Sequence, residues 1–164
     1  MSGAFLSDAR QLLSETFDGI LETLDGLDAD RLNAKLDLEG ANSLAVIAVH
    51  ASKSARTWSA VAMGAELPHR DRPAEFRTVV DSPASFLEEL ADAHREALAY
   101  LAAEPELPWD ELRPTHPRAD GSTERVTGSW ALLHGMEHAR EHLSQMSLTR
   151  QALEDGRLGG APQG

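Results

Sequence analysis

Cysteine is absent from the 164 residues of this chain. Its absence excludes disulfide bonds, thiolate metal ligands and a cysteine nucleophile. Any metal ligands must therefore come from histidine or carboxylate side chains, and any thiol chemistry needs sulfur that arrives on a small molecule.

Basic residues are scarce, with 15 lysines and arginines against 27 aspartates and glutamates, for a formal net charge of −12. Affinity for nucleic acids and for anionic membranes rests on basic side chains, so this balance argues against both partners. No apolar run approaches the roughly 20 residues that span a bilayer, and the first residues lack the apolar core of a signal peptide. We therefore expect a cytoplasmic protein with no nucleic-acid or membrane partner.

Strand-forming segments are few, since residues 77–81 (RTVVD) form the only β-like run. Asn42 and Ser82 are suitable N-cap residues, and Gly64 is a suitable helix stop. Helical periodicity covers four segments, residues 7–27, 42–63, 82–103 and 127–155. The sequence therefore predicts an all-α fold, a four-helix bundle.

Long connections separate the predicted helices, at residues 28–41, 64–81 and 104–126, and the last of these contains four prolines. Long loops in a small bundle often form functional rims or crossovers. We expect residues 1–155 to form one domain and the glycine-rich residues 156–164 to form a flexible tail.

Three histidines, His134, His138 and His142, recur at four-residue intervals in the last predicted helix. Side chains four residues apart lie on one face of a helix, so these imidazoles form a column. His50 lies alone in an otherwise apolar segment of the second predicted helix. Two imidazoles one turn apart and a third from another helix can hold one metal ion with open coordination positions. The spacing alone leaves open whether His134 or His142 acts with His138.

Two segments together resemble a known family. NSLAVIAVHASKSARTW (residues 42–58) and LLHGMEHAREHLSQMSLTR (residues 132–150) are similar to the two diagnostic helices of the DinB-like superfamily. That superfamily includes YfiT-type metal-dependent hydrolases and S-transferases that use bacillithiol or mycothiol. Its last helix commonly carries H-x-x-x-H with a glutamine three residues later, in the form HRGQ. This chain has HLSQ there, which keeps the ligand spacing but lacks the arginine and the glycine.

The resemblance implies that His50, His138 and His142 bind a divalent metal ion, such as zinc, nickel or iron, and that Gln145 is the motif glutamine. It implies a metal-dependent S-transferase that joins a low-molecular-weight thiol to a small-molecule substrate, in a protein that is often a homodimer. Metal-assisted hydrolysis of a small molecule is one alternative. A non-catalytic, stress-associated binding or scaffold protein is another.

Other residues allow further hypotheses. Glu141 lies within an H-x-x-E-H string and is a candidate general base beside the metal. A diiron carboxylate site needs Glu-x-x-His pairs on two helices, and the predicted helices contain none. A hemerythrin-like site needs further ligands, for which His94 is the candidate on the third predicted helix.

Aromatic and basic residues near the column have two interpretations each. Trp58 and Trp130 either line the mouth of a pocket or anchor the core. Arg56 and Arg140 either bind an anionic substrate or lie on solvated helix faces.

Overall fold

The computed structural model describes residues 3–103, 108–117 and 120–156, and most of them are helical. The tail predicted for residues 156–164 lies outside these ranges except for Gly156. The elements are α1 (Gly3–Leu24), α2 (Ala29–Asn33), α3 (Leu44–Met63), α4 (Arg72–Glu75), α5 (Pro83–Tyr100), β1 (Leu112–Pro114), β2 (Arg125–Thr127) and α6 (Gly128–Glu154). The predicted predominance of helix is confirmed.

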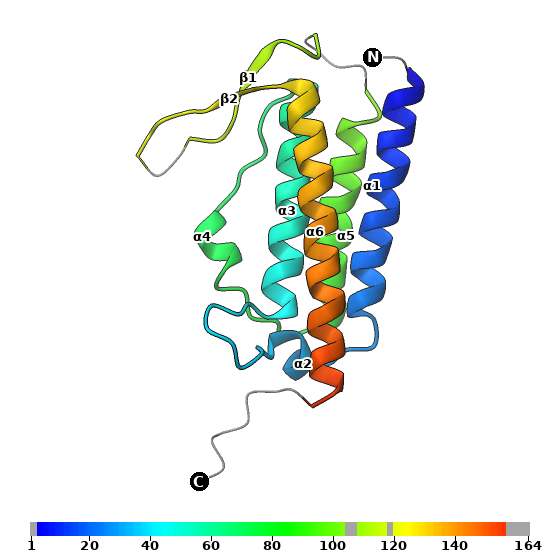
Figure 1. Ribbon diagram of the computed structural model, residues 1–164, viewed down its shortest axis with the longest axis vertical. Helices are drawn as coiled ribbons and strands as arrows, with labels where there is room; N and C mark the ends of the chain where they lie inside the picture. The colour runs from blue at the N-terminus through cyan, green and yellow to red at the C-terminus, as the bar shows by residue number, and fades with distance from the viewer. Residues whose placement is uncertain (1–2, 104–107, 118–119, 157–164) are drawn as a thin grey trace.

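Four long helices, α1, α3, α5 and α6, lie side by side along the long axis of the molecule (Figure 1). In that view α1 and α6 run in one direction, and α3 and α5 run in the other. Because α3 and α5 point the same way, residues 64–82 must return along the length of α3, and this crossover carries the short helix α4. Among the described residues, no helix combines the length and apolar character needed to cross a bilayer.

The helix ends follow from capping chemistry, with some differences from the sequence prediction. The N-cap of α3 is Ser43 and not Asn42, because the Ser43 side chain accepts the hydrogen bond from the backbone N–H of Val46. Gly64 ends α3 in the left-handed conformation, at φ 75°, as predicted. Helix α1 begins and ends earlier than the predicted residues 7–27, and α5 ends three residues before the predicted Ala103.

Residues 77–81 do not form the strand that their composition suggested. The side chain of Asn33 accepts a hydrogen bond from the Val80 N–H at 2.9 Å and donates one to the Val80 carbonyl at 2.8 Å. These bonds satisfy the backbone groups of Val80 that a strand partner would have used. The strands β1 and β2 lie instead within the proline-rich connection, where they pair antiparallel with Arg113 opposite Val126.

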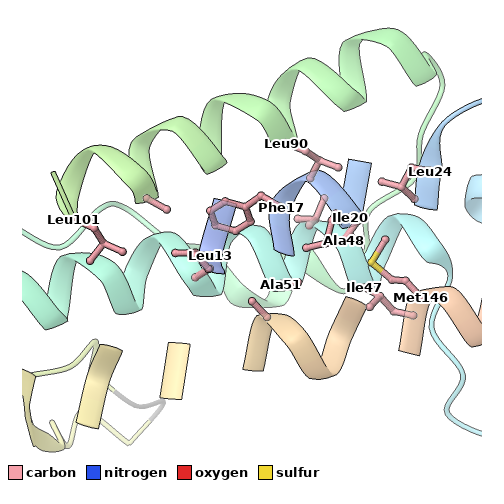
Figure 2. Close-up of a cluster of buried hydrophobic side chains, with 14 of the residues drawn as sticks. Leu13, Phe17, Ile20, Leu24, Ile47, Ala48, Ala51, Leu90, Leu101 and Met146 are labelled. Atoms are coloured by element: carbon pink, nitrogen blue, oxygen red, sulfur yellow. The ribbon is translucent and has the colours of Figure 1, made fainter. Parts of the chain in front are cut away.

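The core lies between the four long helices, as Figure 2 shows. Its side chains include Leu13, Phe17, Ile20 and Leu24 of α1, Ile47, Ala48 and Ala51 of α3, Leu90 of α5, and Met146 of α6. Burial of each large apolar side chain contributes about 1.5–3 kcal/mol of stability. The apolar residues that recur along α1 from Leu6 to Leu24 are buried, as the helical periodicity of this segment predicted.

Helices α3 and α6 approach closely at Gly135. A Cβ atom added to Gly135 would lie 2.7 Å from the Cβ atom of Trp58, which is closer than real Cβ atoms come. Only glycine therefore allows this separation between the two helices. Gly135 lies within the predicted histidine column, between His134 and His138.

Candidate metal centre

The structure brings together the three histidines that the family resemblance named. His50 lies in the first half of α3, and His138 and His142 lie one turn apart in the middle of α6. One nitrogen of each ring lies within 4.8 Å of a nitrogen of each of the other two. The ring centroids of His50 lie 5.1 Å from His138 and 5.2 Å from His142. Imidazoles from two distant segments of the chain thus converge on one point.

His134 is on the same face of α6 but outside this group. Its ring stacks on Trp130, with centroids 4.6 Å apart and an interplanar angle of 19°. Trp58 meets both rings edge-on, at 4.7 Å from His134 and 5.5 Å from Trp130. We call Trp58, Trp130 and His134 the aromatic rim. It begins one helical turn from His138, with the His134 and His138 centroids 5.8 Å apart.

A buried carboxylate contacts the group from the crossover. The Nδ1 atom of His50 lies 2.9 Å from Oε2 of Glu75, which is only 2% exposed. Arg70 donates to both oxygens of the same carboxylate, from Nε at 2.7 Å and from Nη2 at 2.9 Å. Sequence reasoning missed Arg70 and Glu75, because they lie in a predicted loop where no periodicity relates them to His50.

In both His50 and His142, the Nδ1 atom of the ring is hydrogen-bonded to a side-chain oxygen. His142 Nδ1 lies 2.9 Å from the side-chain oxygen of Gln145, as Nδ1 of His50 lies beside Glu75. Both acceptors are oxygens, so each Nδ1 is assigned as the donor and Nε2 is the nitrogen left free. Gln145 therefore has the geometry of a residue that orients His142.

Burial lowers the pKa of both His138 and His142 and so favours their neutral forms. Burial, reinforced by the charges of His142 and His50, lowers the pKa of His138 to about 3. Burial also lowers the pKa of His142, against the opposing effects of the Gln145 hydrogen bond and the Glu141 charge. Burial alone would raise the pKa of Glu75, but its bonds to Arg70 and His50 lower it below the usual value.

These residues fit a metal ion. A neutral imidazole offers a lone pair, and nitrogen donors of this kind suit zinc, nickel and iron. Within the described part of the chain, the buried Nδ1 atom of His138 has no hydrogen-bond partner. A hydrogen bond from a ligating histidine to a carboxylate, as between His50 and Glu75, is a common feature of protein metal sites.

The other predicted site residues are not members of the group of three imidazoles. Glu141 is exposed on α6, and its role as a general base stays a prediction. Arg56 is paired with Glu96 at 2.9 Å, and Arg140 is exposed with its guanidinium 3.4 Å from the hydroxyl of Thr16. His94 is buried on α5, outside the group of three histidines.

Comparison with known proteins agrees with this geometry. The model of the mycothiol-S-transferase family matches residues 8–155, which include all three histidines and all of the long helices except the first five residues of α1. A search among individually curated proteins found no significant match. The matched family lies within the DinB/YfiT-like superfamily, so the resemblance seen in the two helix motifs is confirmed. The chain belongs to the mycothiol-S-transferase family.

Proposed function

We propose that this protein is a metal-dependent S-transferase that joins mycothiol to a small electrophile, on a DinB-like four-helix bundle. His50, His138 and His142 hold one divalent metal ion in this proposal. The observation that carries it is the convergence of three imidazole nitrogens within 4.8 Å of one another, from α3 and α6. The family match supports the thiol as co-substrate.

The three histidines suit this chemistry because at least two are held neutral. A divalent ion bound by them would lower the pKa of a nearby thiol and so supply thiolate at neutral pH. The thiol proton leaves to solvent, the sulfur forms a bond to the electrophilic carbon, and the leaving group departs with its electron pair. The chain has no cysteine, so no protein thiol competes for the electrophile.

The aromatic rim supplies the binding surface for the rest of the substrate. Trp130 is 46% exposed although it packs against His134 and Trp58. An exposed indole beside a reactive centre offers a large apolar face at small entropic cost. His134, the member of the rim nearest to the metal-binding residues of this proposal, lies one helical turn from His138, and Trp130 stacks on the far side of His134.

Metal content and thiol transfer together test the proposal. The protein is purified without a histidine tag, and bound metal is measured by mass spectrometry of the elements. Mycothiol and a small haloalkane are then supplied, and the thioether product is quantified. We expect about one metal ion per chain and loss of thiol equal to the thioether formed.

The control is a pair of histidine variants. His138→Ala should lose both the metal and the transfer activity, whereas His69→Ala, which changes a histidine outside the group, should keep both. Transfer at the parent rate by metal-free protein would contradict the proposal. So would a His138→Ala variant that retains full metal content.

A further inference from the structure

We infer that Glu75, held by Arg70, is a positioning residue that fixes the ring of His50 for metal binding. The inference rests on the proposed metal site and goes beyond it, because it assigns a role to a part of the chain outside α3 and α6. It makes the crossover of residues 64–82 a component of the site.

The contacts of Glu75 leave little freedom to its carboxylate. Oε1 accepts from Arg70 Nε at 2.7 Å, and Oε2 lies 2.9 Å from both Arg70 Nη2 and His50 Nδ1. The side chains of Arg70 and Glu75 are 12% and 1% exposed. Burial of a carboxylate costs stability unless it is paired, and a two-pronged contact with arginine is the strongest common pairing.

This arrangement selects one tautomer of His50. If the proton were on Nε2, the lone pair of Nδ1 would face a carboxylate oxygen at 2.9 Å, which is repulsive. With the proton on Nδ1, the ring donates to Glu75 and Nε2 is free. Arg70 Nη2 lies farther from Nδ1, at 3.4 Å, so its main partner is the carboxylate.

The local backbone holds Glu75 in this position. The short helix α4 is capped by Asp71, whose side chain accepts from the N–H of Ala74 at 3.0 Å. The Thr78 hydroxyl donates to the Glu75 carbonyl at 2.8 Å. Phe76 packs on the His50 ring, with centroids 5.0 Å apart. This segment thus contacts His50 twice, through the carboxylate of Glu75 and through the ring of Phe76.

Zinc affinity is the main readout. Loss of the partner that orients a ligating histidine typically weakens metal binding by 10–100-fold. We expect Glu75→Gln to weaken zinc binding at least tenfold, measured by competition with a chromophoric chelator. Because this change leaves Arg70 buried without its partner, the double variant Arg70→Met, Glu75→Gln is measured as well, with thermal unfolding of the metal-free protein.

The double variant separates positioning from folding. The double variant removes both charges, so we expect its stability without metal to be closer to that of the parent than the stability of Glu75→Gln is. Its zinc affinity should still be at least tenfold weaker than that of the parent. The matched control is Arg56→Met, Glu96→Gln, which removes another arginine–glutamate pair, 2.9 Å apart and more exposed. Its zinc affinity should equal that of the parent.

A second readout does not involve metal. Long-range ¹H–¹⁵N spectra of the metal-free protein should show the proton of His50 on Nδ1 in the parent and a shifted Nδ1 resonance in the double variant. A zinc affinity within tenfold of the parent in the folded double variant would overturn the inference. Failure of the proposed function is distinct, since parent and His138→Ala would then bind zinc equally weakly.

Discussion

Two buried histidines, His50 on α3 and His94 on α5, are 7% and 4% exposed, yet their surroundings differ in kind. His50 contacts a carboxylate on one side and two further imidazoles on the other. His94 lies 2.7 Å from the hydroxyl of Ser52 and stacks on Phe17, with centroids 4.0 Å apart and rings nearly parallel.

The comparison shows that burial alone does not make a histidine a ligand. Burial lowers the pKa of His94 to about 4, so the ring is a neutral, polar core residue at pH 7. His50 has about the same exposure, but Glu75 accepts a hydrogen bond from one of its nitrogens. A ring nitrogen of His50 also lies within 4.8 Å of a nitrogen of His138 and of His142. The neighbours of a histidine, and not its depth, distinguish the two kinds of site.

The largest expected difference between the two is in metal affinity. His50→Ala should weaken zinc binding by at least 100-fold, because it removes one of three proposed ligands. His94→Ala should leave zinc binding within twofold while lowering the melting temperature, since it removes a packed ring from the core. Competition titrations and thermal unfolding measure both. Equal loss of zinc affinity in the two variants would remove the distinction.

The next largest effect is on stability in acid. The folded-state pKa of His94, about 4, lies below its ordinary value of 6.5, so between these values the unfolded chain binds a proton that the folded chain does not. This contribution to stability is complete above about pH 6.5 and is lost as the pH falls toward 4. By pH 4.5 the loss amounts to about 2–3 kcal/mol.

His94→Gln isolates that loss, because glutamine can still bond Ser52 but does not titrate. Urea denaturation at pH 7.5 and pH 4.5 should show that the variant loses about 2–3 kcal/mol less stability than the parent. The titration of His138 is present in both proteins and cancels in the difference. An unchanged pH dependence would show that His94 is already solvated in the folded state.

The smallest effect should come from the exposed carboxylate beside His142. Glu141 lies in solvent, where water screens its charge, whereas Glu75 is buried against His50. Glu141→Gln should therefore change kcat for thiol transfer by less than about threefold. A fall of 100-fold or more would restore Glu141 as the general base that its H-x-x-E-H string suggested.

The features that follow from local spacing could be predicted from the sequence. The four long helices follow from apolar periodicity, and the placement of His138 and His142 on one face follows from their four-residue interval. Spacing could not choose between His134 and His142. The choice came from the motif resemblance, and the structure places His142 with His138 and His50 while His134 stacks on Trp130.

The parts that depend on tertiary contact could not be predicted. Nothing local relates Glu75 to His50, because their contact exists only where the crossover returns along α3. The hairpin of β1 and β2 was missed because its short strands lie in a proline-rich segment without alternation. The conformation of the β-like residues 77–81 also depends on a tertiary contact, because the side chain of Asn33 binds both backbone groups of Val80.

The absence of a side chain at Gly135 has a consequence for the geometry of the proposed metal site. The gap between α3 and α6 is set where Gly135 meets Trp58, less than one helical turn from His138. A methyl group at position 135 would lie 2.7 Å from the Cβ atom of Trp58, so the two helices would have to move apart beside the proposed ligands. Gly135 therefore keeps α3 and α6 at the separation at which their three imidazoles converge, although it offers no donor atom of its own.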